Sequence, residues 1–401
     1  MQLIEVNTPA QAREFIRVNH LINKDNPAYI HPLDKDVNEV FDREKNKAFR
    51  SGEVIRWILK DVNGQTAGRI AAFTNKKYRN KGDDVPVGGI GFFDCINNQE
   101  AADMLFDVAK HWLRQKGMEA MDGPINFGER DRWWGLVVKG HELEPMYCMN
   151  FNYPYYQQLF ENYGFQGFYN QICFAMNTGV ILLSKYYERH HECARDPNFS
   201  ARHIRKKELD RFAKDFTIVY NKAWAGHGGM KQIDEKVVRK MFRSMKPVMD
   251  EKICWFAYYK DEPIATWINL PDLNQWFKHL KGKFDLFHKL KFLWLKATKK
   301  NSKFNGLVFG VVPEFQGKGV DSYIIIEGAK LIQDLTYPKG SIVPIVGKPL
   351  YEKYEMQWIG EFNPKMVNVA EGLGTYRSRI LTTYRYLFDR TKEFKAHPVL
   401  L

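Results

Sequence analysis

The residues best suited to chemistry form a glycine-rich turn, Val311-Val-Pro-Glu-Phe-Gln-Gly-Lys-Gly-Val-Asp321, between a predicted strand and a predicted helix. Gly317 and Gly319 allow backbone N–H groups to converge on one point. The start of a helix adds a partial positive charge, and Lys318 adds a full one. The turn therefore predicts an anion site whose natural ligand is a diphosphate. A plain tight turn is the alternative that the same residues allow.

The elements around this turn occur twice in the 401-residue chain. The segments Val54–Phe73 and Ile253–Leu270 each predict a strand, a tight turn and a second strand. The segments Gly88–Lys116 and Leu307–Leu335 each predict a strand that leads into a long helix with apolar residues at helical spacing. The order of the two pairs is the same, which indicates an internal duplication.

A third pair is the most specific. Pro154 and Pro364 are each followed by Glu at position +7 and Gly at position +10, a pattern typical of a short helix. We therefore expect two similar units, at about residues 1–200 and 201–401, joined near Arg195–Arg205. Strands grouped before and after helices predict an α/β (α+β) fold, with a mixed, largely antiparallel sheet flanked by helices in each unit.

These motifs resemble the GNAT superfamily of acyl-CoA-dependent N-acyltransferases. Its signature for the coenzyme A pyrophosphate, Gln or Arg-x-x-Gly-x-Gly or Ala, aligns with Gln316–Asp321. A closer likeness is to a group of uncharacterised bacterial proteins with a GNAT-like fold. That group shares Leu-Pro-Asp-x-Asn (Leu270–Asn274), Val-Pro-Glu-aromatic-x-Gly-x-Gly (Val312–Gly319) and Gly-Pro-x-Asn-Phe (Gly123–Phe127). The resemblance covers nearly the whole chain and implies two GNAT-like units in tandem.

The resemblance implies that acetyl-CoA or another acyl-CoA binds the second unit as co-substrate, with no metal. The residues expected to bind it are Val311, Val312, Gln316, Gly317, Lys318, Gly319 and Val320. The first unit has Asp94–Glu100 in place of the glycine turn, so by resemblance it is a degenerate, non-binding copy. The sequence departs from the family pattern at two points, of which the second concerns both units. Asp321 stands where the signature has a small residue, and Phe160 and Ala370 stand where many GNAT enzymes have a tyrosine acid.

Direct acyl transfer to an amine needs a base for the ammonium proton and a proton donor for the departing thiolate. For the base we expect Glu314 or Asp272, although a solvated turn residue and a turn-building residue are the structural alternatives. For the acid we expect Tyr354, chosen from the candidates Tyr351, Tyr354 and Tyr376. The oxyanion also needs an N–H donor, which a bulge in the strand near its end at residues 311–312 would supply.

The acceptor is expected between the two units, beside Asn274. In the first unit, Asn126 and Trp134 lie in a long loop where aromatic side chains beside glycine and proline can form the wall of a ligand site. Packing between the units is the equally good alternative for this loop.

Positive charge is concentrated in one segment. The whole chain carries +13, and Lys278–Lys303 alone holds nine lysines and one acid, interleaved with Phe, Leu and Trp. Such a segment could lie on a membrane surface, bind phosphates or cover an apolar chain. The alternative is a helical excursion whose apolar side packs on the domain while its lysines face water. No zinc-finger, RRM or basic-zipper pattern is present, which argues against nucleic acid as a partner.

Composition excludes other classes. Hydrophobic residues make up 44% of the chain, so it is neither disordered nor fibrous, and no apolar run approaches the ~18 residues of a membrane span. The N-terminal segment lacks the pattern of a secretion signal, and five scattered cysteines predict reduced thiols in a cytoplasmic protein. In His190-His191-Glu-Cys193, adjacent helical side chains diverge by roughly 100°, which argues against a metal site.

The sequence therefore favours a cytoplasmic, bacterial acyl-CoA-dependent N-acyltransferase that acts on a small-molecule or anionic amine. A non-catalytic GNAT-like ligand-binding protein is the alternative that Asp321 and the missing tyrosine suggest. A transferase of the tandem-GNAT type that uses aminoacyl-tRNA is the other, because the positive charge would suit an RNA-borne donor.

Overall fold

The computed structural model describes residues 1–224 and 232–400, and its elements follow the predicted order twice. The first half contains β1 (Gln2–Glu5), α1 (Pro9–Asn23), α2 (Asp34–Val40), β2 (Gly52–Lys60), β3 (Thr66–Asn75), β4 (Val87–Cys95), α3 (Gln99–Gln115), β5 (Ala120–Gly123), β6 (Leu136–Lys139), α4 (Tyr155–Tyr163) and β7 (Gln166–Asn177).

The remainder of the chain contains α5 (Ser184–Ala194), β8 (Phe199–His203), α6 (Leu209–Ala223), α7 (Glu235–Met245), β9 (Trp255–Tyr259), β10 (Glu262–Pro271), α8 (Asn274–Phe277), α9 (Leu286–Thr298), β11 (Lys303–Val311), α10 (Val320–Ile332), β12 (Leu335–Thr336), β13 (Ile345–Val346), β14 (Lys353–Met356), β15 (Ile359–Gly360), α11 (Pro364–Gly372) and β16 (Tyr376–Leu387).

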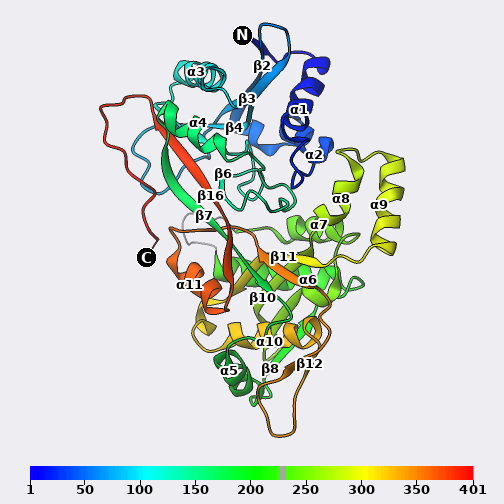
Figure 1. Ribbon diagram of the computed structural model, residues 1–401. Helices are drawn as coiled ribbons and strands as arrows, with labels where there is room; N and C mark the ends of the chain where they lie inside the picture. The colour runs from blue at the N-terminus through cyan, green and yellow to red at the C-terminus, as the bar shows by residue number, and fades with distance from the viewer. Residues whose placement is uncertain (225–231, 401) are drawn as a thin grey trace.

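One sheet runs through both halves (Figure 1). Over the described residues it has 14 strands, in the order β1-β2-β3-β4-β5-β16-β7-β14-β11-β10-β9-β8, with β15 beside β7 and β6 beside β16. Within the same residues only β4–β5 and β11–β14 are parallel pairs. The mixed, largely antiparallel sheet that the sequence predicts is confirmed.

The two halves exchange their last strands. β16, at the end of the second half, lies between β5 and β7 of the first half, whereas β7 pairs with β14 of the second half. Figure 1 shows these two long strands running side by side from one half of the molecule into the other. Neither half therefore has a complete sheet of its own. The expected boundary near residue 200 stays a prediction, and the exchanged strands β7 and β16 cross it in space.

Side chains that alternate between the two faces of a strand explain why apolar cores form on both sides of the sheet. In β3, Ile70 and Ala72 pack in a core with α3, while Ala71 and Phe73 pack in a second core with α1 on the opposite face. Helix ends follow the predicted chemistry as well. Thr8 caps α1 in a capping box with Gln11, and α4 ends at Gly164 in the left-handed conformation, as its proline–glycine pattern predicts.

The second half repeats this arrangement around α10, which packs on β9, β10 and β11. Helix α5 packs directly on α10, and β8 pairs with β9, so both elements lie with the second half although they precede residue 205. Figure 1 shows α5, β8 and α10 together at the end of the molecule remote from α3.

An ion pair buried in the sheet fixes β16 to the second half. Glu355 of β14 and Arg379 of β16 are 2% and 1% exposed, and the Nε of Arg379 lies 3.0 Å from Oε1 of Glu355. Ser378 donates its hydroxyl to the same oxygen at 2.8 Å. Burial by itself would raise the pKa of Glu355, but Arg379 and Lys303 outweigh it and lower this pKa from 4.5 to about 2.

A second buried pair fixes β16 to the first half. Arg385 donates from Nε to Asp122 of β5 at 2.6 Å and also pairs with Asp83 at 2.8 Å. Its guanidinium lies 3.6 Å from the centre of the Phe168 ring, and Tyr78 donates its hydroxyl to Asp122 at 2.6 Å. Asp122 lies in β5, which pairs in parallel with β4, and Glu355 lies in β14, which pairs in parallel with β11. The two carboxylates therefore occupy matching positions in the two halves, and each pairs with one arginine of β16.

We expect Glu355→Gln to lower the free energy of unfolding by about 3–5 kcal/mol at neutral pH, because it leaves the Arg379 charge buried without its counter-ion. The folded-state pKa of Glu355 lies below its ordinary value of 4.5, so its stabilisation is complete above pH 4.5 and is lost as the pH falls toward 2. The difference between variant and wild type, measured by denaturant unfolding, should shrink over that range.

Glu371→Gln is the matched control, because Glu371 forms an ion pair of 2.6 Å with Arg377, also from β16, at an exposed site. It should cost no more than about 1 kcal/mol. Equal effects of the two substitutions would contradict the role given to the buried pair.

Candidate functional site

The glycine turn at the start of α10 has the conformation that its residues require. Gly317 and Gly319 have φ angles of 73° and 80°, in the left-handed region where side chains are strained. A Cβ added to Gly317 would meet no atom within 4 Å, so the turn is open at this point. Gln316 ties the turn to the strand, because its side-chain amide donates to the carbonyl of Val311 at 3.0 Å.

The two repeated helices differ at their N-termini. Asn98 caps α3 by accepting the N–H of Ala101 at 2.8 Å. Helix α10 has Gly319 at its N-cap and no side-chain hydrogen bond there. Its first N–H groups are therefore left without a side-chain cap, as they are in helices that bind anions at their N-terminus.

Charges of both signs lie around the turn. Lys318 is exposed, and Arg189 of α5 lies close enough that a Cβ on Gly319 would come within 3.4 Å of it. Asp321 lies in the first turn of α10, where it stabilises the helix dipole but opposes an anion. Glu314 is a further exposed carboxylate of the turn, so Lys318 is the cation that the turn itself supplies.

The three valines assigned to cofactor binding line the core rather than the surface. Val311, Val312 and Val320 are buried in the apolar cluster of the second half. The N–H of Val312 donates to the carbonyl of Ile264 at 2.9 Å, so it is not free to serve an oxyanion as the sequence suggested.

An open strand edge lies further back along β11. Its parallel pairing with β14 ends at Gly306 and Met356, so over the described residues the stretch Leu307–Val311 has a strand partner on one side only. The register between β10 and β11 also shifts at Ile268 and Asn269, opposite Leu307. The predicted bulge therefore lies at Leu307 rather than at the end of the strand.

An apolar cavity of about 80 Å³ lies between α10, α11 and the diverging strands β11 and β14. Its walls are almost wholly apolar and include Trp267, Phe309, Ile325, Met356, Ala370 and Leu373. Ile325 lies five residues beyond Val320, which is about 8 Å along the axis of α10. The cavity therefore begins within two turns of the glycine turn.

Three polar residues line this cavity, Thr178, Gln333 and Tyr354. Tyr354 accepts a hydrogen bond from Nε1 of Trp267 at 3.3 Å, and burial raises the pKa of its hydroxyl to about 12. The hydroxyl stays protonated at neutral pH and can donate a proton. Gln333 donates to the carbonyls of Thr178 and Val180, while its Oε1 is buried and has no hydrogen-bond partner among the described residues.

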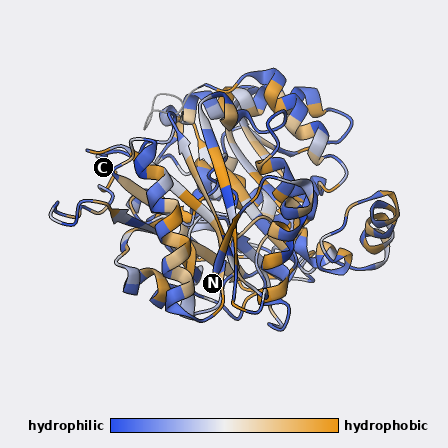
Figure 2. Ribbon diagram, turned by 90° about the horizontal axis from the view of Figure 1, so that it is seen from above, coloured by the Kyte–Doolittle hydropathy of each residue, from blue (hydrophilic) through white to orange (hydrophobic). Residues whose placement is uncertain are grey.

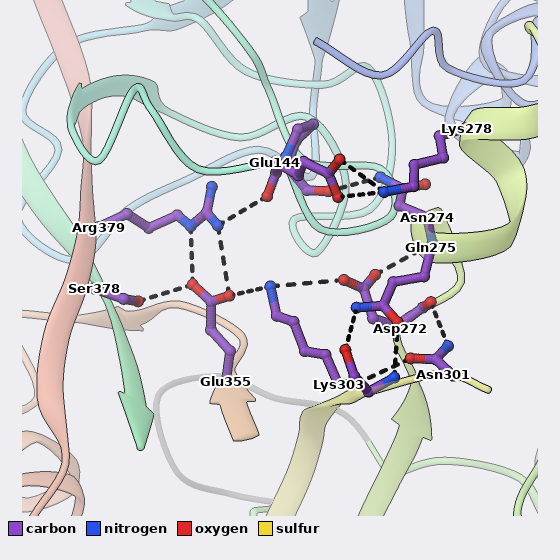
Figure 3. A network of polar contacts seen from close by, with 12 residues as sticks. Glu144, Asp272, Asn274, Gln275, Lys278, Asn301, Lys303, Glu355, Ser378 and Arg379 are labelled. Atoms are coloured by element: carbon purple, nitrogen blue, oxygen red, sulfur yellow. Dashed lines mark hydrogen bonds and ion pairs between the residues drawn. The ribbon is translucent and has the colours of Figure 1, made fainter. Parts of the chain in front are cut away.

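Asp272 lies elsewhere, in the buried polar network drawn in Figure 3. Lys303 stands between two carboxylates, 3.6 Å from Oδ2 of Asp272 and 2.5 Å from Oε2 of Glu355. Burial is the largest influence on Asp272 and raises its pKa, because Lys303 opposes it only in part. Asn274 donates from its side chain to the carbonyl of Pro145 at 2.7 Å, so this network joins the two halves.

The predicted base candidates do not come together. Asp272 lies beside Lys303, at the start of β11, and Glu314 is exposed just beyond the other end of that strand. The eight residue steps from Lys303 to Val311 span about 26 Å. Tyr354 pairs with Phe304 and so lies at the end of the strand nearer Asp272.

Asn126 and Trp134 line a different groove, of about 560 Å³, in the first half. Trp134 is buried and donates from Nε1 to the hydroxyl of Tyr169 at 2.8 Å. Asn126 is also buried, and its Oδ1 has no partner among the described residues. The structure thus separates these two residues from the cavity beside α10.

The sequence did not indicate the residues that dominate the apolar cavity and the buried polar network. Trp267, Phe309 and Gln333 carry no motif, and only the fold brings them to the cavity. The buried partners Glu355 and Arg379 had no distinct signal, because their strands also contain the charged residues Lys353, Arg377 and Arg385. Among residues 1–224 and 232–400 no group of side chains could hold a metal ion.

No protein-family profile matches the chain. A bacterial ceramide synthase from Caulobacter vibrioides is 25% identical over 383 residues, which cover 94% of this chain and 96% of that protein. Protein YghO from Escherichia coli is 24% identical over 378 residues, covering 90% and 89%. A solved tandem GNAT protein from the clavulanic acid biosynthesis pathway covers 98% of this chain and all of its own, with a TM-score of 0.53 and 10% identity.

The structural likeness covers both halves, so the chain has the tandem GNAT fold that its motifs indicate. The relatives found by sequence are bacterial proteins, one of which is named for ceramide synthesis. At 10% identity the structural match supports the fold alone, and any activity has to be argued from the residues of the site.

We expect Ala370→Leu to leave the free energy of unfolding unchanged within about 1 kcal/mol, because the added carbons enter the cavity that Ala370 lines. Ala102→Leu on α3 is the control. Ala102 is fully buried and lies outside this cavity, so the larger side chain should cost about 1–3 kcal/mol. Equal losses from both substitutions in denaturant unfolding would show that the space beside α11 is closed in solution.

Proposed function

We propose that this protein transfers an acyl group from acyl-CoA directly to an amine, and that the second half carries the site. The observation that carries the proposal is the open glycine turn at the uncapped start of α10, within two turns of an apolar cavity. Acyl-CoA combines a diphosphate with a thioester-linked chain at the far end of its pantetheine arm, so it needs both an anion site and an apolar site. The tandem GNAT fold supports the same assignment.

The chain's own residues suit the two ends of such a substrate. N–H groups of the first turn of α10 and the charge of Lys318 would hold the diphosphate. The open edge of β11 from Leu307 to Val311 would offer N–H donors to the thioester oxygen, where charge develops during attack.

In the reaction, the amine nitrogen forms a bond to the acyl carbon while the carbon–sulfur bond breaks. The thiolate takes a proton, and we assign its donor as Tyr354, whose hydroxyl reaches the cavity and has a pKa of about 12. The proton of the ammonium group goes to solvent, because Asp272 is already engaged by Lys303 and Asn274 within the buried network.

The apolar walls support a fatty acyl group and a lipid-like amine. The Caulobacter relative is named a ceramide synthase, and a ceramide is the amide of a fatty acid with a long-chain amino alcohol. That relative aligns with 94% of this chain, and the cavity lining here is apolar where a fatty chain would lie. We therefore place long-chain acyl-CoA and a long-chain amino alcohol first among the substrates to test.

Titration calorimetry with coenzyme A tests the turn. Wild type should bind, Gly317→Glu should abolish binding, and Lys318→Ala should weaken it about tenfold because a charge-assisted contact is lost. Asp321→Asn should tighten binding about threefold, since it removes a negative charge near the diphosphate. Lys339→Ala, at an exposed lysine between β12 and β13, is the control and should bind as wild type does. Absence of heat with every protein would refute the proposal.

An acyl-transfer assay with palmitoyl-CoA and sphinganine tests the chemistry. We expect Tyr354→Phe to lower kcat about a hundredfold with little change in KM, because only the departing thiolate needs its proton. Ala370→Leu should favour acetyl-CoA over palmitoyl-CoA, since it narrows the cavity.

Tyr351→Phe serves as the control in this assay. The hydroxyl of Tyr351 donates to Asp250 at 2.7 Å and lies outside the cavity, so its loss should leave kcat near the wild-type value. If coenzyme A binds but no amide forms with any chain length or amine, the protein is a non-catalytic acyl-CoA-binding protein.

A further inference from the structure

The basic segment between β10 and β11 forms a small helical excursion that stands beside the body of the molecule. Figure 1 shows α8 and α9 at its right-hand side, and Figure 2 shows the same excursion separated from the rest when the molecule is seen from above. The chain leaves the sheet after Pro271 and returns to it at Lys303.

One face of α9 holds the excursion together. Phe292 and Leu295 are buried against Trp276, Phe277 and Leu280 in a cluster that also includes residues 33 and 273. The excursion is fastened to the first half by polar contacts too. The N–H of Asp34 donates to the carbonyl of Gly282 at 2.8 Å, and Lys278 pairs with Glu144 at 2.9 Å. The helix is therefore a fixed part of the structure.

The opposite face of α9 is apolar and has nothing packed on it among the described residues. Its side chains are exposed by 74% at Leu286, 70% at Phe287, 60% at Leu290, 54% at Leu293 and 59% at Trp294. The spacing i, i+1, i+4, i+7, i+8 places all five on one stripe of the helix. The alternative that the apolar side of this segment packs on the domain thus holds only for the inner face.

Lysines border this stripe. At about 100° per residue, Lys289 and Lys291 lie on its two flanks, each roughly 100° from its centre. Lys281 and Lys283 are exposed before the helix, and Lys300 is exposed after it. The one acid of the segment, Asp285, is used at the N-cap, where it accepts the N–H of His288 at 3.1 Å.

The combination of an exposed apolar stripe and neighbouring lysines indicates what kind of partner would cover this face of α9. A protein partner or a second copy would need a complementary apolar surface, and nucleic acid would need bases or phosphates over the five apolar side chains. A lipid surface satisfies both features together, because leucine, phenylalanine and tryptophan enter the boundary between headgroups and acyl chains while lysines meet phosphates. No helix in the described part of the chain is long and apolar enough to cross a membrane, so the contact would be with one leaflet.

We infer that the outer face of α9 docks this protein on the surface of an anionic lipid bilayer, with its five exposed apolar side chains in the interfacial layer and the flanking lysines on lipid phosphates. The inference rests on the exposed stripe and the charge around it, and it does not depend on the proposed acyl transfer.

Vesicle flotation with the full chain tests this. Wild type should float with vesicles of phosphatidylcholine and phosphatidylglycerol, bind vesicles of phosphatidylcholine alone at least about tenfold more weakly, and lose binding as salt is raised. Phe287→Ser combined with Trp294→Ser should weaken binding to anionic vesicles more than about tenfold, because two of the inserted side chains are lost.

Two further variants keep the test specific. Lys281→Gln with Lys283→Gln should abolish the preference for anionic vesicles. Val62→Ser with Ile345→Ser removes two equally exposed apolar side chains elsewhere and should bind as wild type does. A polarity-sensitive fluorophore at Leu290→Cys should shift to the blue on anionic vesicles and give no shift with vesicles of phosphatidylcholine.

The inference is overturned if the Phe287/Trp294 variant floats as well as wild type, or if binding is equal for both kinds of vesicle. It is also overturned if light scattering shows a dimer that dissociates in this variant, which would make the stripe an interface between copies. Salt-dependent binding of tRNA with no binding to vesicles would likewise exclude it.

Discussion

The position of β16 between the two halves is the constraint on which the rest of this structure depends. Two of its three arginines, Arg379 and Arg385, are buried in ion pairs, with Glu355 on one side and Asp122 on the other. A buried charge is costly unless it is paired. Arg385 of β16 pairs with Asp122, whereas Glu355 has both Arg379 of β16 and Lys303 of its own half as partners. β7 is fixed by the same arrangement, because it lies between β16 and β14. The two halves are in this sense joined through one continuous sheet.

The same constraint determines the surroundings of Asp272, which the sequence offers as a candidate general base. Asp272 has the residue type and the sequence context of a general base, yet it shares Lys303 with Glu355 and accepts the backbone N–H of Asn274. Its neighbours also connect the halves, since Asn274 and Arg379 donate to carbonyls in residues 144–145. The buried network does not occupy the other end of β11 or the cavity beside α10, which are the places that the proposed function uses.

The two halves share their fold but differ at the start of the long helix. Both have a strand that leads into a long helix, but the first half places Asp94 there, paired with Arg69 at 2.7 Å, and caps α3 with Asn98. Those contacts satisfy the groups that an anion would need. The second half leaves the start of α10 uncapped behind two glycines, and it alone inserts the excursion with an exposed apolar stripe. Features that cost stability, such as uncapped N–H groups and exposed leucine, are thus gathered in one half.

The sequence by itself determined the elements and their duplication. Periodicity, capping residues and the proline–glycine spacing are local signals, so the long helices, the short helices α4 and α11, the mixed sheet and the glycine turn could all be predicted. It also identified the two features that now carry the proposals, the turn and the basic segment. Only the tertiary structure decided the contacts between residues that lie far apart in the sequence. Arg385 and Asp122 are 263 positions apart, and nothing local to either specifies that they pair or that the last strands are exchanged. The same holds for Asp272 and for α9. Distant parts of the chain decide whether Asp272 is paired and whether the apolar stripe of α9 faces the protein or the solvent.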